Sequence, residues 1–238
     1  MRSSNPVFRS IERSEVFTST DVATYRGIFL KTTLMILIAA LSGYFAVTYF
    51  QESLYALLIP SVIIAFIAVI VSMRSVRFAR VGAIIYALSE GVLLGTITWI
   101  MNIYYPGIAT TALVGTASIF TVMLFLYSSR TIRVTTRMRK VMYSILLGIL
   151  LFFVSSMILR LFGVTIDISS SLALGISGLL IVFGALMLTL DFDRAESIVS
   201  GEYDKSYEWI VAVGLMVTLV WIYIELLRFL AIISSNRR

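Results

Sequence analysis

Four carboxylates and one arginine lie inside, or at the edge of, long apolar stretches of the sequence, where charge is costly. Glu90 is the tenth residue of one such stretch and has no charged neighbour within one helical turn. A carboxylate in the hydrocarbon layer costs at least about 2.5–3.5 kcal/mol on insertion scales, so each one is a functional hypothesis by default. Glu90 must therefore find a partner on another helix, face a wet cavity or stay protonated.

Glu225 and Arg228 lie in the last apolar stretch, three residues apart, and so share one face of a helix. An ion pair that partly neutralises itself is the plain explanation for both residues. The other pairing that we consider joins Glu90 to Arg228 across two helices. In either case the pattern predicts that Glu90 and Glu225 face the interior of the bundle rather than lipid.

Asp191 and Asp193 end the sixth apolar stretch, in the run Leu190-Asp191-Phe192-Asp193-Arg194. Arg194 can pair with either carboxylate, and one of the two could simply be solvated at the membrane edge. Further acidic residues follow, up to Glu208, on a side of the chain that is otherwise basic. This acidic segment would attract cations to a cytosolic mouth, and a salt network with the basic residues 130–140 explains it equally well.

Several classes of protein are excluded by residue types that the sequence lacks. It contains no Cys and no His, which excludes disulfides, Cys or His metal sites, and Ser–His or Cys–His catalysis. It has no GxxxxGK[ST] phosphate loop and no Gly-x-Gly-Asp protease motif. The only lysines, Lys31, Lys140 and Lys205, are not deep in the last stretch, where a retinal protein needs one. We therefore expect neither enzymatic activity nor a cofactor.

The elements that position these residues are seven apolar stretches, each near the ~20 residues that span a bilayer core. With 59% hydrophobic and 13% charged residues, the 238-residue chain has too little charge to cover a globular surface. The sequence predicts an all-α integral membrane protein: a polar segment (1–26), a seven-helix domain (27–233) and a short tail (234–238). The stretches are Gly27–Phe50, Leu54–Met73, Val81–Met101, Ile108–Ser128, Val141–Leu159, Ile168–Leu190 and Ile210–Ile233.

The distribution of Lys and Arg predicts the topology. One side carries 14 basic residues, in the N-terminal segment and in the loops after the second, fourth and sixth stretches, and the other side carries 3. We therefore expect a multi-pass protein of the inner (plasma) membrane, with a cytosolic N-terminus and an outer C-terminus. A re-entrant last stretch would instead return Arg237 and Arg238 to the cytosol. The net charge of +6 reflects this topology and does not indicate a nucleic-acid partner.

Five runs of the sequence resemble the Bax inhibitor-1 family (the TMBIM superfamily), and in particular its bacterial branch. Their order and spacing cover nearly the whole chain. The runs are Ser4-Asn5-Pro6-Val7-Phe8, Ser89-Glu90-Gly91-Val92-Leu93-Leu94-Gly95, Leu190-Asp191-Phe192-Asp193, Glu208-Trp209 and Val217-Thr218-Leu219-Val220-Trp221-Ile222-Tyr223-Ile224-Glu225-Leu226-Leu227-Arg228.

The resemblance implies a fold in which the last helix is central between two three-helix layers. It also implies a pH-sensitive passive leak of cations, mainly calcium, through the bundle. One carboxylate then ends the sixth helix, another lies in the seventh, and the two share a proton in the closed state. Asp193 matches the first position, and an ungapped alignment places Thr218 at the second. Glu90 and Asp193 are the family-like site residues, where calcium would bind transiently.

Because Thr218 stands where the second carboxylate is expected, we predict weaker acid-range gating than in relatives that keep both. Glu225 lies seven residues further on, about 10 Å along the helix, which is too far for it to share a proton with Asp193. Thr218→Asp should strengthen the gating. If another acid provides the pairing, Asp191 and Glu208 are the first candidates, because both lie at the same membrane edge.

Two functions from different classes follow from these patterns. The first is a passive cation (calcium) leak channel gated by protonation, with Glu90, Asp191, Asp193, Thr218, Glu225 and Arg228 along its pathway. The second is a regulatory membrane protein without transport activity, which binds a membrane protease or the stress and cell-death machinery through residues 1–26. Proton-coupled transport of a small solute would share the buried carboxylates, but the sequence has no obvious inverted repeat.

Overall fold

Seven long helices make up the fold in a computed structural model, which describes residues 22–163 and 169–236. All seven are long and apolar enough to cross a membrane, as predicted. Residues 1–21 of the polar segment, the predicted start of the sixth stretch at Ile168, and the last two residues lie outside the described part. The helices are α2 (Tyr25–Tyr49), α3 (Leu54–Arg74), α4 (Ala79–Tyr104), α5 (Ile108–Ser128), α6 (Thr136–Leu161), α7 (Ser170–Ser200) and α8 (Tyr207–Asn236).

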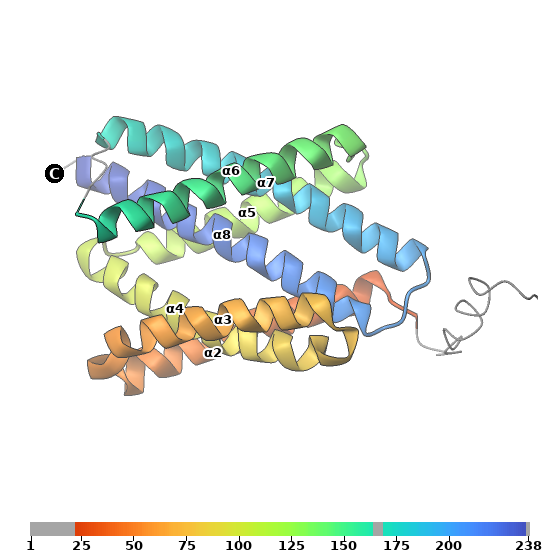
Figure 1. Cartoon of the computed structure of the whole chain (residues 1–238), viewed down its shortest axis with the longest axis horizontal. Helices are drawn as coiled ribbons and strands as arrows, with labels where there is room; N and C mark the ends of the chain where they lie inside the picture. The colour runs from red at the N-terminus through yellow and green to blue at the C-terminus, as the bar shows by residue number, and fades with distance from the viewer. Residues whose placement is uncertain (1–21, 164–168, 237–238) are drawn as a thin grey trace, which may run out of the picture.

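Helix α8 is the centre of the bundle, which confirms the predicted arrangement of the last helix. It crosses between one layer made of α2, α3 and α4 and a second made of α5, α6 and α7 (Figure 1). Its buried side chains contribute to clusters on both sides, with Val213 and Met216 in one and Leu215 and Ile222 in another. Its first two turns are enclosed by protein, because all of residues 208–213 are buried.

The layer of α2, α3 and α4 is closely packed through small residues. A Cβ added to Gly91 of α4 would lie 2.3 Å from the Ala39 carbonyl oxygen of α2, and one added to Gly95 would lie 2.6 Å from Gly43 Cα. Glycine at these positions lets the two backbones approach each other, as is common between membrane helices. The Gly91–Gly95 pair therefore serves close packing between α2 and α4.

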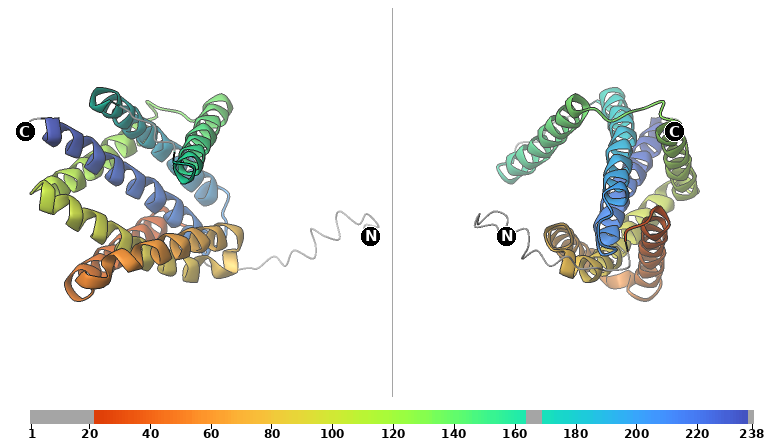
Figure 2. Two further views of the ribbon diagram at one scale, coloured as in Figure 1. Left: turned by 60° about the vertical axis from the view of Figure 1, so that its left-hand side comes forward. Right: turned by 90° about the vertical axis from the view of Figure 1, so that its right-hand side faces the viewer.

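Helix α6 is packed much less closely than the others (Figure 2). Met142 is its only buried residue, and it contacts Phe183 and Leu190 of α7. Large apolar side chains cover much of the rest of its surface, including Leu147 at 56% exposed and Met157 at 61% exposed. In a bilayer these side chains meet acyl chains, so exposure of this kind is compatible with a stable membrane protein.

Helix α7 continues ten residues beyond Leu190, where the apolar stretch ends. Hydropathy marks the end of the membrane-spanning segment, but the helix extends because Phe192 and Ala195 still pack against the bundle. Asp191 and Asp193 therefore lie within a helix rather than in a loop. We call the end of the bundle where α2 and α8 begin and α7 ends the basic end, because most basic residues predicted to be cytosolic lie there.

Candidate functional site

Asp191 contacts Thr218 at the interface between α7 and α8. The Thr218 hydroxyl donates a 2.6 Å hydrogen bond to Asp191 Oδ2. The alignment predicted Asp193 at the position opposite Thr218, and the structure places Asp191 there instead. The physical reason is helical geometry: residues two apart on an α-helix point about 200° from each other, so the two aspartates cannot both face α8.

Asp193 points away from α8 and forms an ion pair with Arg139 of α6. The Arg139 Nη2 atom is 2.5 Å from Asp193 Oδ2, and both side chains are partly exposed, at 51% and 26%. The predicted contact between the acidic segment and the basic residues 130–140 is thus present. Arg139 rather than Arg194 is the partner of Asp193. Tyr127 of α5 also donates a hydrogen bond to Glu196, one turn further along α7.

Glu225 forms the predicted i,i+3 ion pair with Arg228. The distance from Arg228 Nη1 to Glu225 Oε1 is 3.1 Å, and the Ser177 hydroxyl of α7 donates a 3.1 Å bond to Oε2. The Glu225 residue is 4% exposed, which confirms that it faces the interior. Arg228 therefore pairs within α8 and not with Glu90.

Glu90 lies on the buried face of α4. Tyr86 and Ala87, one turn earlier on this face, pack into the cluster shared by α2, α3, α4 and α8. Glu90 is 7% exposed, which confirms its predicted interior orientation. Within residues 22–163 and 169–236, no hydrogen bond or ion pair to its carboxylate is found. Glu90 is thus a buried carboxyl whose charge no neighbouring group described here neutralises.

Glu208 forms a buried ion pair that the sequence reasoning did not predict. Its side chain is fully buried, and Lys31 Nζ of α2 lies 2.6 Å from its Oε2 atom. The backbone N–H and the hydroxyl of Thr24 donate to Oε1 at 2.8 and 3.2 Å. Gly27 leaves room for the carboxylate, because a Cβ there would lie 2.1 Å from it. A usable signal was the single lysine in the first apolar stretch, which needs a carboxylate partner.

The carboxylates follow α8 along its length. Glu208 lies at the basic end, Asp191 lies beside Gly214 and Thr218, and Glu225 lies near the opposite end. From Glu208 to Glu225 is 17 residues, about 26 Å at 1.5 Å per residue. Within the described residues, no three carboxylates come together as a calcium site would require.

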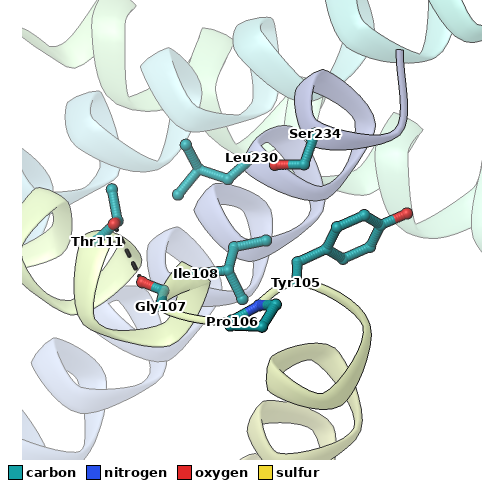
Figure 3. Close-up of a pocket in the computed structure, with 7 residues that line it drawn as sticks. All are labelled: Tyr105, Pro106, Gly107, Ile108, Thr111, Leu230 and Ser234. Atoms are coloured by element: carbon teal, nitrogen blue, oxygen red, sulfur yellow. Dashed lines mark hydrogen bonds between the residues drawn. The ribbon is translucent and has the colours of Figure 1, made fainter. Parts of the chain in front are cut away.

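Two of the cavities formed by the described residues lie beside α8, and none of the six predicted site residues lines either one. The larger, of about 980 Å³, runs between α2 and α5, and we call it the α2–α5 groove. The smaller, of about 370 Å³, lies where the α4–α5 turn meets the end of α8, between Tyr105 and Ser234 (Figure 3). It has no charged residue in its lining. The carboxylates are therefore held between helices rather than gathered in one open cavity.

Comparison with known proteins assigns the chain to a family. No curated protein matches it. The family described as Bax inhibitor 1 like matches residues 5–235, a range that includes all seven helices and the carboxylates described above. Together with the central α8 and the two layers around it, this match shows that the chain belongs to the Bax inhibitor 1-like family of membrane proteins.

Proposed function

We propose that this protein is a pH-sensitive passive leak channel for cations, with calcium as the main ion. The observation that carries the proposal is the contact between Asp191 and Thr218. It places a carboxyl group of α7 against the central helix with an uncharged partner. Ionisation there is costly unless water or a cation approaches, so the charge state of Asp191 controls the α7–α8 interface.

In this proposal the other carboxylates are further positions along α8 at which a cation binds transiently. Calcium prefers several oxygen ligands, and carboxylates with backbone carbonyls supply a transient, weak set. Glu208 and Glu225 are occupied by Lys31 and Arg228, whereas Glu90 and Asp191 have no ion pair with a neighbouring side chain among the described residues. This arrangement fits a closed bundle in which two carboxyls respond to pH. Transient calcium at Glu90 and Asp193 remains part of the proposal.

The test is calcium flux into dye-loaded liposomes between pH 5 and 8. Thr218→Asp places a second carboxyl beside Asp191, and two such groups in contact share a proton, so the acid-range dependence should become steeper. Adding Asp191→Asn should remove that steepness, whereas adding Asp193→Asn should retain it, because Asp193 points toward α6. No flux above that of empty liposomes at any pH in this range would refute the channel.

A regulatory role is the second candidate, and one observation favours it. Thr24 docks on Glu208, and Ala23 N–H donates to the Tyr203 carbonyl at 2.8 Å, so the start of α2 is tied to the loop before α8. A partner that pulls on the preceding residues would thereby act on α8. Deleting residues 1–21 leaves these contacts in place. If every co-purifying partner remains bound to that variant, the regulatory role loses its support.

We propose a non-enzymatic role for the protein. The proposed location is the inner membrane, with a cytosolic N-terminus and an outer C-terminus. The support is the basic end, together with the odd number of apolar helices. Assignment to the bacterial branch of the family remains a prediction from the run at residues 4–8. A reporter fused after Arg238 that is active only outside the cytosol should give signal. Activity of a cytosol-only reporter at this position would overturn the topology.

A further inference from the structure

The α2–α5 groove is an apolar groove along the side of the bundle. The proposed ion pathway does not include it. The floor of the groove is α8, with Leu215, Leu219 and Tyr223 in the lining. Its walls are α2, α5 and residues 91–102 of α4, and two residues of α7 also line it. Along α2 the lining runs from Tyr25 to Val47, which is 22 residues or about 33 Å. This length matches the hydrocarbon core of a bilayer, which is about 30 Å thick.

The lining of the groove offers little to a polar occupant. None of its residues is charged. Four of its hydroxyls are already used inside the protein, because Thr32 and Thr116 donate to the backbone of their own helices and the hydroxyls of Thr98 and Tyr223 bond to each other. An apolar cavity of this kind excludes water and accepts hydrocarbon. The groove therefore selects an apolar occupant over an aqueous cation.

The rims of the groove continue into the lipid-facing surface. Phe29 and Tyr44 of α2 and Leu113 of α5 line it and are 59%, 66% and 61% exposed. The groove therefore opens sideways, toward the bilayer. Its two ends carry Tyr25 and Trp99, and aromatic side chains of this type lie at membrane–water interfaces.

The occupant is indicated by the position and the lining of the groove. The groove lies along the hydrocarbon core, carries no charged residue in its lining and opens toward the bilayer. Acyl chains of the bilayer meet that opening from the side, and being apolar they need no hydrogen-bond partner from the lining. We propose that the α2–α5 groove is a binding site for an acyl chain of a bilayer phospholipid.

The test uses tryptophan fluorescence in vesicles of phosphatidylcholine with brominated acyl chains, because bromine quenches tryptophans that it contacts. The full chain has three tryptophans, Trp99, Trp209 and Trp221, which are replaced by Phe. One reporter is then added at the groove floor, Leu219→Trp, with Val220→Trp as a second floor position. Leu147→Trp on the exposed face of α6 is the lipid-contact control. Retaining only Trp209, which is 9% exposed and outside the groove, gives the buried control.

Quenching of the floor reporter to the level of Leu147→Trp, with little quenching of Trp209, is the expected result. A filling substitution on the α5 wall, Ala117→Phe, should reduce the quenching to the Trp209 level. Val122→Phe on the same helix is 55% exposed and outside the lining, and should not change it.

Three results would overturn the proposal. The first is a floor reporter that stays unquenched at both positions while Leu147→Trp is quenched. The second is quenching by aqueous acrylamide instead of bromine, which would show a water-filled groove. The third is quenching that depends on the ratio of protein to lipid, which would show a second copy of the chain in the groove. Each variant is first compared with the native chain by helical circular dichroism and elution volume, so that misfolded protein is excluded.

Discussion

The two three-helix layers around α8 are packed in different ways, although all six helices are apolar enough to cross a membrane. In the layer of α2, α3 and α4, backbones approach each other at Gly91 and Gly95. In the layer of α5, α6 and α7, a Cβ added to Gly148 of α6 or Gly175 of α7 would meet nothing within 4 Å. Hydrophobicity does not drive helices together inside lipid, so small residues at a contact decide which layer is tight.

The ion pair of the first layer is also more deeply buried than the ion pair of the second layer. Lys31–Glu208 joins the first layer to α8 with side chains 15% and 0% exposed, whereas Arg139–Asp193 joins α6 to α7 with side chains 51% and 26% exposed. Their distances, 2.6 and 2.5 Å, are nearly equal. A short distance therefore does not measure the strength of a pair, because burial determines what is lost when one partner is removed.

The largest effect should come from Lys31→Met, which leaves the fully buried Glu208 without a cation. Removing one partner of a buried pair costs about 3–5 kcal/mol. We expect the low end of this range, because Thr24 still donates to the carboxylate. The matched change Arg139→Met should cost about 0–1 kcal/mol. Reversible unfolding in mixed micelles measures both, and equal losses would contradict the comparison.

Gly91→Ala should destabilise the tight layer by about 1–3 kcal/mol, the usual cost of overpacking. The added methyl would meet the backbone of α2 at Ala39, which cannot move aside as a flexible side chain could. Gly148→Ala is the matched change in α6 and should be neutral or slightly stabilising, since Ala favours helix by about 1 kcal/mol. Melting temperatures of purified protein test this pair. A larger loss at Gly148 would show that α6 packs more closely than described.

Ser177→Ala should have the smallest effect of the three, about 1 kcal/mol. It removes the hydroxyl that links α7 to Glu225 of α8, but Arg228 still donates to that carboxylate. Ser177→Thr keeps a hydroxyl and is the control. Unfolding in mixed micelles again gives the difference. A loss as large as that of Lys31→Met would mean that the second layer depends on this contact more than its packing indicates.

Much of the fold could be predicted from local sequence because the physical signal is local. A stretch of about 20 apolar residues must form a helix in lipid, since no water is present to satisfy its backbone. The seven helices, the pairing of Glu225 with Arg228 and the interior orientation of Glu90 all follow from spacing along one helix or from the cost of burying charge. The central place of α8 came instead from the family resemblance.

Only the tertiary structure decided which side chains meet across helices. Lys31 and Glu208 are 177 positions apart, and each looks like an ordinary residue near a membrane edge until α2 is laid against α8. The choice of Asp191 over Asp193 as the neighbour of Thr218 depends on how α7 is rotated against α8. The sequence alone determined the residue types, their order and the apolar segments. The rotation of each helix and its contacts with other helices were decided by packing. They depend on how the surfaces of two helices fit together, and the residues that meet there are far apart in the sequence.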